Sequence, residues 1–379
     1  MVGRSVTPDI DPETQALLAR YGFDAEAFER MRRHLASVRA ADIPASSRIA
    51  GQVVPPEPED VLVLPSDDRP SGEANRASGE QALAAGQVGL VVLAGGMATR
   101  FGGAVKAATE VMDGHSFLEL KVAVARAVAA RVGARLPMFL MTSFATAERV
   151  GELAARLESP EVPIATFAQS VSLRLTPEGA LFREADGKPS LSAPGHGDLL
   201  GCLRKSGTLA RFAAQGGRWL LVSNVDNLGA TPDPAVVGAH LRAGRPVTVE
   251  VTHKEPGDKG GAPARVEGVL QIVESFRFPA DFDQDQIPVF NTNSFVFDAA
   301  AIDRDFPLTW FLVPKDIGGR VAVQLERLVG QVTAFLPAQY LQVPRAGPAS
   351  RFLPVKDPDE LERRRPDIRQ VLAAHGVAL

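Results

Sequence analysis

From Val88 onward, short apolar runs of strand type alternate with longer stretches whose apolar residues have helical spacing. The strand candidates are Gly89–Leu93, Met138–Met141, Ile164–Phe167, Trp219–Ser223, Val247–Thr252 and Ser294–Phe297. The helix candidates between several of them are Phe117–Val132, Ala145–Leu157, Leu199–Ala214 and Pro234–Ala243. Alternation of this kind indicates a largely parallel sheet with helices on both faces. We therefore predict a three-layer α/β fold whose ligands bind at the C-terminal ends of the strands.

The segments that flank this region have different patterns. A chain of 379 residues exceeds the usual size of one domain, so we expect a large α/β domain with appendages, or two domains. Apolar positions between Pro12 and Ala41 predict two amphipathic helices, and the Pro-, Ser- and Asp-rich stretch Pro55–Glu80 predicts an irregular surface connection. The tail from about Pro337 is short and charged. The predicted division is residues 1–84 for N-terminal helices and connection, 85–335 for the catalytic domain and 336–379 for a C-terminal segment.

Composition restricts the partners and the compartment. The chain has 41 Lys and Arg against 45 Asp and Glu, a net charge of −4, and no clustered basic patch, which argues against nucleic acid. Cys202 is the single cysteine, so an intrachain disulfide and a cysteine metal cluster are excluded. No apolar run approaches membrane-spanning length, and the N-terminus lacks the apolar core of a signal peptide. We expect a cytoplasmic protein with small-molecule partners, no nucleic acid and no membrane.

A glycine-rich, basic stretch follows the first strand candidate in VVLAGGMATRFGGAVK, residues 91–106. Glycines such as Gly95 and Gly96 allow close approach, and backbone N–H groups in such a turn bind phosphate. Arg100 and Lys106 add two cations. The spacing fits neither the dinucleotide-binding fingerprint nor the P-loop. The stretch favours a polyphosphate ligand, and the alternative is a plain strand-to-helix turn.

A carboxylate follows another strand candidate. The stretch SNVDNLGATPD places Asn224, Asp226 and Asn227 directly after the apolar run that includes Leu221 and Val222. A carboxylate at the C-terminal end of a strand can hold Mg²⁺ through oxygen and leave positions open for substrate phosphates. The alternative is a turn in which Asp and Asn cap the next helix.

Two further polar stretches are candidates for ligand contact. In PGHGD, His196 lies between two glycines, a loop that allows backbone to approach a flat ring or a phosphate, although a lone loop histidine is more often structural. Asn291 and Asn293 alternate on a strand candidate and would project to the same side. With Glu274 they could recognise sugar hydroxyls, and the alternative is the polarity of an edge strand.

Together these stretches resemble the UTP–glucose-1-phosphate uridylyltransferases, the eukaryotic type of UDP-glucose pyrophosphorylase. The segments LAGGMATRFGG, FAQS, PGHGDLL, SNVDNLGAT, DKGGAPARVEG, FNTNSF, QLER and VPRAGPASRFLPVKDPDEL occur in the order of that family, from Leu93 to about Leu361. The resemblance implies a Rossmann-like, GT-A-type nucleotidyltransferase core with a mixed sheet. It also implies synthesis of UDP-glucose and pyrophosphate from UTP and glucose 1-phosphate with Mg²⁺.

The same resemblance implies roles for single residues. The catalytic cations would be Lys106, Lys356 and Arg100, and Asp226 would ligate Mg²⁺. The nucleotide-binding residues would be Leu93, Gly95, Gly96, Gln169, Gly195, His196 and Gly197. The sugar-binding residues would be Asn224, Gly261, Glu274, Asn291 and Asn293. In-line attack of a sugar phosphate on the α-phosphorus needs alignment and charge neutralisation, and an ionised phosphate needs no general base.

Alternatives to this function stay open at the level of sequence. Ala98 stands where the family usually has glycine, and the interval from Gly96 to Lys106 is one residue shorter than usual. One alternative is a related enzyme for galactose 1-phosphate or N-acetylglucosamine 1-phosphate, and another is a non-catalytic nucleotide-sugar sensor. Retention of Lys106, Asp226 and Lys356 favours an enzyme. The oligomeric state is not predicted.

Overall fold

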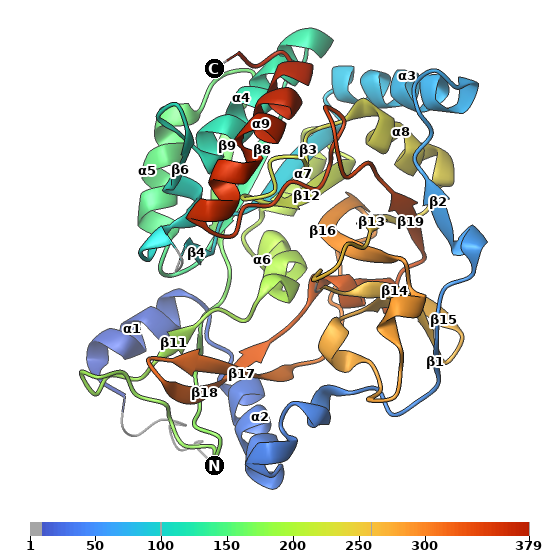
Figure 1. The fold of residues 1–379 in the computed structure, drawn as a ribbon. Helices are drawn as coiled ribbons and strands as arrows, with labels where there is room; N and C mark the ends of the chain where they lie inside the picture. Colours follow the sequence, from blue (N-terminus) through green and yellow to red (C-terminus); the bar gives the residue numbers. More distant parts are fainter. Residues whose placement is uncertain (1–9, 99–100, 259, 379) are drawn as a thin grey trace.

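The fold is built on one large mixed sheet. The computed structural model describes residues 10–98, 101–258 and 260–378 (Figure 1). Its central sheet has eight strands in the order β2-β19-β13-β16-β12-β3-β8-β9. Their bounds are β2 (Val61–Val63), β3 (Val88–Leu93), β8 (Met138–Thr142), β9 (Ile164–Ala168), β12 (Trp219–Asn224), β13 (Val247–His253), β16 (Val289–Asp298) and β19 (Ala338–Gln342). β16 runs antiparallel to both neighbours and the other neighbouring pairs run parallel, so the predicted largely parallel, mixed sheet is confirmed.

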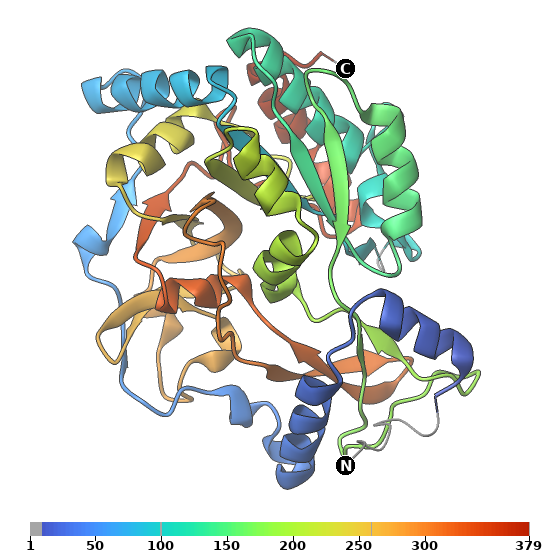
Figure 2. The ribbon, with the colours of Figure 1, turned by 180° about the vertical axis from the view of Figure 1, so that it is seen from behind.

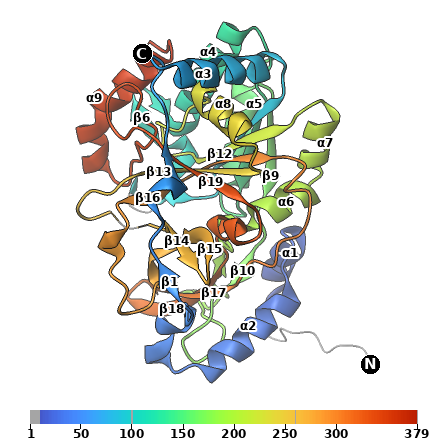
Figure 3. The ribbon, with the colours of Figure 1, turned by 90° about the vertical axis from the view of Figure 1, so that its right-hand side faces the viewer.

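Helices cover one face of this sheet and a mixed layer covers the other (Figures 2 and 3). The first face carries α3 (Pro70–Ala84), α4 (Phe117–Val132), α5 (Ala147–Leu157), α8 (Pro234–Ala243) and α9 (Pro358–Ala374). The second face carries α6 (Leu199–Lys205), α7 (Thr208–Ala214) and the hairpin of β14 (Ala262–Val266) and β15 (Val269–Val273). Because both faces are buried, β3, β8 and β12 are almost continuously apolar. The predicted three-layer α/β architecture is confirmed.

The two N-terminal helices do not pack on the central sheet. α1 (Pro12–Arg20) and α2 (Ala25–Ser37) share a separate core with the short strands β10 (Ser172–Leu173) and β11 (Leu191–Ser192) and with the hairpin of β17 (Phe311–Ile317) and β18 (Arg320–Glu326). Figure 1 shows this unit at the lower left, below the edge of the sheet. The remaining short strands are β1 (Val53–Val54), β4 (Met97–Ala98), β5 (Ala104–Val105), β6 (Glu110–Met112) and β7 (His115–Ser116).

The stretch Pro55–Glu80 was predicted to be irregular, and this prediction is wrong for much of its length. It contains β2 at an edge of the central sheet and most of α3. A Cβ at Gly79 would lie 1.9 Å from the Pro234 carbonyl oxygen, and one at Gly238 would lie 1.7 Å from that of Asn75. Glycines therefore let the backbones of α3 and α8 touch directly. Because glycine has a low helix propensity, the local sequence of this stretch did not indicate a helix.

Three other features differ from the sequence expectations. The helix expected over Leu199–Ala214 is two helices, because Gly207 between them takes a left-handed φ of 73°. The C-terminal segment is more than a charged tail, since it supplies β19 to the sheet and α9 to one face. The sheet thus takes strands from both flanking segments as well as from residues 85–335. Within the described ranges, no helix combines the length and apolar character needed to span a membrane.

Candidate active site

The candidate site lies where β3 and β12 end side by side. These parallel neighbours are in a register that pairs Leu93 with Asn224, the last residues of the two strands. The Val225 N–H donates to the Leu93 carbonyl at 3.2 Å, which continues the pairing one step further. The glycine stretch after Leu93 and the acidic stretch after Asn224 therefore leave the sheet at the same edge, as predicted for parallel strands.

The glycine stretch forms a small hairpin. The sequence suggested a turn that leads directly into a helix, which the described residues do not form. β4 pairs with β5, and the Lys106 N–H donates to the Gly96 carbonyl at 3.1 Å. Gly102 and Gly103 have φ values of 79° and 82°, which favour glycine, so the chain can reverse there. α4 starts only at Phe117. The hairpin returns Lys106 to Gly96 despite the shortened interval, whereas Arg100 lies outside the described residues.

The predicted phosphate-binding lysine and the predicted metal-binding carboxylate meet at this edge. The Lys106 Nζ lies 2.5 Å from the Asp226 Oδ2, and the two side chains are only 19% and 16% exposed. Across the described part of the chain, no group of three or more His, Cys, Asp or Glu residues is placed to hold a metal. A single carboxylate suits Mg²⁺ in a nucleotide enzyme, because water and phosphate oxygens supply the other ligands. The donor set here therefore fits that ion.

The C-terminal segment lies against the loop that carries Asp226. Buried Asn227 donates from Nδ2 to the Arg351 carbonyl at 3.1 Å, and its Oδ1 accepts from the Leu353 N–H at 2.8 Å. This pairing brings the PVK motif beside the loop, and Lys356 is exposed at its end. Asn227 is part of the SNVDNLGATPD stretch, and its role in joining the two segments was not predicted. Its partners are too far along the chain to be found from local patterns.

The predicted sugar-binding asparagines gather beside Asn224 through a bulge in β16. The register of β13 and β16 shifts between Glu250 and Val251, and Asn293 has a φ of 58°. Regular alternation, which was the basis for placing Asn291 and Asn293 on one side, is interrupted there. The Asn293 Nδ2 donates to the Asn224 Oδ1 at 2.9 Å, and its backbone N–H donates to the Asn291 Oδ1 at 2.9 Å.

Asn293 is held in a left-handed conformation and has an unused acceptor. Such backbone costs about 1–3 kcal/mol for a residue with a side chain and often marks a functional site. Its Oδ1 is buried and has no hydrogen-bond partner among the described residues. A buried acceptor without a donor is unfavourable until a ligand supplies one. The bulge therefore presents an amide oxygen suited to a hydroxyl group.

Gly261 and Glu274 form a second part of this cluster. The Asn291 N–H donates to the Gly261 carbonyl at 2.7 Å, and a Cβ at Gly261 would lie 3.0 Å from the Glu274 carboxyl carbon. The pKa of Glu274 is raised from 4.5 to about 7, mainly by burial; the Arg277 charge opposes this shift and the nearby Glu326 charge contributes to it. The carboxyl group therefore changes charge near neutral pH. The structure brings together all three of Gly261, Glu274 and Asn291.

The predicted nucleotide-binding residues Gly95 and Gln169 are in contact. A Cβ at Gly95 would lie 2.4 Å from the Gln169 Nε2, so the missing side chain makes room for the amide. Gln169 follows β9, is 6% exposed, and its Oε1 has no hydrogen-bond partner in the described ranges. This is a second buried amide oxygen without a donor, at the opposite side of β3 from Asn293 in the strand order.

The glycines of the PGHG loop approach protein backbone. A Cβ at Gly197 would lie 2.3 Å from the Arg327 carbonyl carbon, and the Gly195 φ of 81° favours glycine. The His196 Nδ1 accepts from the Val329 N–H at 3.1 Å, and burial lowers the pKa of His196 to about 4. The imidazole is therefore neutral at pH 7 and carries its proton on Nε2.

Asp198, which the sequence analysis did not single out, links this loop to Gln169. Its carboxylate is 2% exposed, pairs with Arg327, and accepts from the Ser170 N–H at 2.6 Å. Ser170 directly follows Gln169, so one buried carboxylate fixes the PGHG loop relative to the amide. No local sequence signal distinguishes this aspartate from an ordinary helix cap.

The fold is the α/β fold of solved UDP-sugar pyrophosphorylases. The structure resembles the UDP-N-acetylglucosamine pyrophosphorylase of Trypanosoma brucei with a TM-score of 0.73 and 20% identity, covering 93% of this chain and 79% of that chain. It also resembles a mutant of the UDP-glucose pyrophosphorylase of Leishmania major, with a TM-score of 0.68, 24% identity, and coverage of 93% and 78%. The chain belongs to the UTP–glucose-1-phosphate uridylyltransferase family, which it matches over residues 47–369.

Curated relatives carry the same family name. The proteins called UTP–glucose-1-phosphate uridylyltransferase from Hordeum vulgare and Solanum tuberosum are each 32% identical over 290 residues, which cover 72% of this chain. Those residues are 60% of each relative, so the chain spans well under two thirds of the length of these proteins. The family that the sequence motifs indicated is confirmed.

Proposed function

We propose that this protein is a nucleotidyltransferase that forms UDP-glucose and pyrophosphate from UTP and glucose 1-phosphate with Mg²⁺. The observation that carries this proposal is the contact of Lys106 with Asp226 at the ends of β3 and β12. There a cation for phosphate and a carboxylate for a metal adjoin Asn224 and its partner Asn293, which suit sugar hydroxyls. Membership of the family and the names of the curated relatives support the same substrates.

The groups at this edge divide the work of an in-line transfer. Asp226 would hold Mg²⁺, which would supply positive charge against the negative charge of the phosphates. Lys106 is tied to Gly96 through its backbone N–H, so its ammonium stays close to a triphosphate lying on the glycine hairpin. Lys356, exposed on the neighbouring segment, would add a second cation. The sugar phosphate is already ionised, so no residue has to remove a proton from it. These residues have only to align the sugar phosphate with UTP.

The nucleotide and the sugar would lie at two sides of the Asp226 loop. We assign Leu93, Gly95, Gly96, Gln169 and the loop Gly195–His196–Gly197 to the nucleotide. The unpaired Gln169 Oε1 suits the N–H donor of a uracil ring. We assign Asn224, Gly261, Glu274, Asn291 and Asn293 to the sugar.

A non-catalytic sensor is less consistent with the structure than an enzyme. The two features that suggested it were Ala98 and the shortened interval before Lys106. Ala98 is only 4% exposed within the β4–β5 pair, so its methyl group does not project into the space above the hairpin. Lys106 reaches Asp226. Neither departure removes a group that the reaction needs.

The proposal is tested by pyrophosphate release from UTP and Mg²⁺ with three sugar phosphates offered separately. We expect release with glucose 1-phosphate at a kcat/KM at least tenfold above the values for galactose 1-phosphate and N-acetylglucosamine 1-phosphate. Preference for one of the other sugars would move the assignment to a related enzyme. UTP binding without release from any of the three would support the sensor.

Removing the Asn293 amide should weaken sugar binding selectively. In Asn293→Gly the left-handed backbone is retained without strain, so the change isolates the side chain. We expect the KM for glucose 1-phosphate to rise about tenfold, equivalent to about 1.4 kcal/mol for one lost hydrogen bond, and the KM for UTP to change less than twofold. Asp113→Gly is the matched control, since Asp113 also has a positive φ, is exposed and lies outside the site. Equal rises in both KM values would remove Asn293 from the sugar site.

Glu274 should make sugar binding depend on pH near neutrality. Its pKa of about 7 means that the carboxylate, which accepts hydroxyl hydrogen bonds, is lost as pH falls below 7. We expect the KM for glucose 1-phosphate to rise between pH 8 and pH 6, and Glu274→Gln to remove that part of the pH dependence. The phosphate groups also titrate near pH 6, so the variant serves as the control for substrate ionisation. A KM that falls toward pH 6 only in the parent protein would show that the protonated acid is the binding form.

The same shift predicts an effect on stability. Between pH 4.5 and 7 the unfolded chain ionises Glu274 while the folded protein keeps the proton, so this group lowers stability as the pH rises through that window. Glu274→Gln should therefore unfold at a temperature equal to or above that of the parent at pH 8, as measured by circular dichroism.

A further inference from the structure

A lysine is buried on the inner face of α4 without a role in the site described above. Lys121 is 8% exposed, and the helix around it presents apolar side chains such as Leu118 and Val122 to the core. Placing an ammonium group there costs several kcal/mol unless polar groups compensate it. An apolar residue would fill this position on a helix face more favourably, so the lysine needs an explanation.

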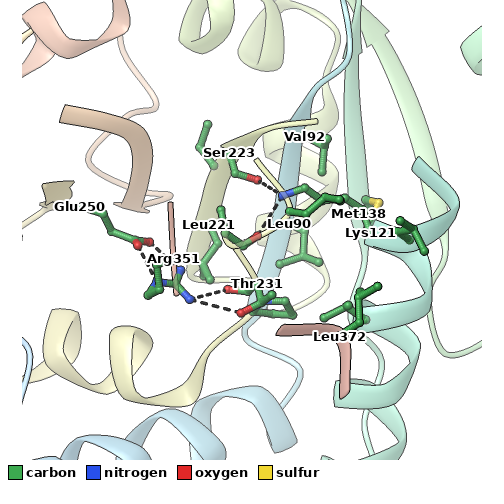
Figure 4. A pocket seen from close by; sticks show the side chains of 16 residues that line it. Leu90, Val92, Lys121, Met138, Leu221, Ser223, Thr231, Glu250, Arg351 and Leu372 are labelled. Atoms are coloured by element: carbon green, nitrogen blue, oxygen red, sulfur yellow. Dashed lines mark hydrogen bonds and ion pairs between the residues drawn. The ribbon is translucent and has the colours of Figure 1, made fainter. Parts of the chain in front are cut away.

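The ammonium of Lys121 bridges the two ends of the loop that carries Asp226. Its Nζ donates to the Ser223 Oγ at 3.0 Å and to the Ala230 carbonyl at 2.9 Å. Ser223 is in β12, before Asp226, and Ala230 is beyond it. Figure 4 shows Lys121 reaching from α4 toward Ser223 across the lining of a small cavity. One side chain therefore closes the loop between its start and its end.

A separate buried ion pair holds the far side of the same loop. The Arg351 Nε and Nη2 pair with the two carboxylate oxygens of Glu250 at 2.5 and 2.7 Å, and the Arg351 Nη1 donates to the Thr231 carbonyl at 3.1 Å. Thr231, Glu250 and Arg351 line the same cavity as Lys121, and its volume of about 30 Å³ has room for water. The loop is thus fixed at Ala230 by Lys121 and at Thr231 by Arg351.

Lys121 and Arg351 are both buried cations, but only Arg351 is paired directly with a carboxylate. Arg351 is neutralised by direct contact with Glu250, whereas Lys121 contacts no carboxylate among the described residues. The pKa of Lys121 is lowered to about 7, mainly by burial; the charge of Asp226 opposes this shift, Arg351 adds to it, and Glu250 also opposes it. Asp226 has the larger electrostatic effect of these two carboxylates. Lys121 therefore acts on the Asp226 carboxylate from the buried side of the loop, through the two ends of the loop, whereas Lys106 contacts that carboxylate directly.

We propose that Lys121 is a positioning residue, which holds the Ser223–Ala230 loop so that Asp226 presents its carboxylate to a divalent metal. The inference rests on the proposed function, because Asp226 is a metal ligand only there. Three features carry it: the two hydrogen bonds that span the loop, the absence of a contacting carboxylate in the described chain, and the independent anchoring of the next residue by Arg351. Lys121, which is 8% exposed and bonded to Ser223 and Ala230, would act on the metal only through Asp226.

Replacing Lys121 with methionine tests this role, because methionine has similar length and no charge. Exchange of a buried charge for an apolar side chain is often neutral or stabilising, so we expect a melting temperature no lower than that of the parent. The affinity for Mn²⁺ in the presence of UTP, measured by electron paramagnetic resonance titration, should fall at least fivefold. The kcat should fall at least tenfold while the KM for UTP changes less than threefold. A residue with only a structural role would lower the melting temperature and leave metal affinity unchanged.

Two companion variants keep the test decisive. Ser223→Ala removes one of the two acceptors and should weaken Mn²⁺ binding two- to threefold, even if the methionine variant does not fold. Lys188→Met removes an exposed lysine that pairs with Glu13 of α1, and it should match the parent in every measurement. Mn²⁺ affinity within twofold of the parent in Lys121→Met, or in Ser223→Ala if the first does not fold, would overturn the proposal. Because metal binding is measured without turnover, an inactive parent protein would count against the proposed function alone.

Discussion

Replacing Asp226 with asparagine should lower the rate of pyrophosphate release by at least about 10²–10³-fold, the scale expected when one charge-stabilising group is lost from a transition state. Asparagine keeps the shape of the side chain but cannot provide the negative charge that a divalent metal requires. The half-saturating Mg²⁺ concentration should rise together with the loss in kcat. Steady-state kinetics across an Mg²⁺ series would measure both effects.

The same substitution at an exposed aspartate controls for unspecific effects. Asp285 is exposed in the short 3-10 helix Gln284–Gln286, and Asp285→Asn should leave kcat and the Mg²⁺ dependence unchanged. The Asp226 variant should fold normally, because asparagine keeps the shape of the side chain and its amide oxygen can still accept a hydrogen bond from the Lys106 ammonium. Activity close to that of the parent would refute the metal assignment and with it the basis for the role of Lys121.

Replacing Lys106 with methionine should reduce kcat by about 10²–10³-fold for a different reason. The ammonium would neutralise charge on the phosphates during transfer, and no other described cation contacts Asp226 at this edge. The backbone contact of residue 106 with Gly96 does not depend on the side chain, so the hairpin should persist. Single-turnover measurements with saturating UTP would separate the transfer step from binding.

The Mg²⁺ dependence distinguishes the two variants. In Lys106→Met the half-saturating Mg²⁺ concentration should stay within about twofold of the parent or fall, since the carboxylate is freed from its ion pair. In Asp226→Asn it should rise. Lys188→Met again provides an exposed control. An unchanged transfer rate in Lys106→Met would show that the Lys106 ammonium does not stabilise the phosphates during transfer.

Much of the fold follows from local sequence. α4 and α8 have the bounds predicted for them, because their end signals lie within a few residues: the capping box of Ser116 and Glu119, the Asp233 cap, and Gly133 and Gly244 with left-handed φ. The strands β3, β8 and β12 were predicted for a similar reason, since strands covered on both faces leave nearly continuous apolar runs. The family motifs also bring the glycine stretch, Asp226 and the asparagines into one predicted site.

Other features depend on contacts that no local pattern contains. α3 was missed because its glycines lower helix propensity, and only the close backbone contact with α8 compensates for them. The bulge at Asn293 replaces regular alternation because β13 pairs with β16 in a shifted register.

The chain by itself determined which strands and helices form and which chemical groups are available, because apolar periodicity, caps and glycine turns act over a few residues. The tertiary structure decided which of those groups meet. Lys106 reaches Asp226, 120 positions away, only because the sheet places β3 beside β12. The pairing of Asn227 with Arg351 and of Lys121 with Ser223 likewise joins residues 124 and 102 positions apart. Contacts at such separation are set by strand order and packing, which depend on the whole fold and not on the neighbours of each residue.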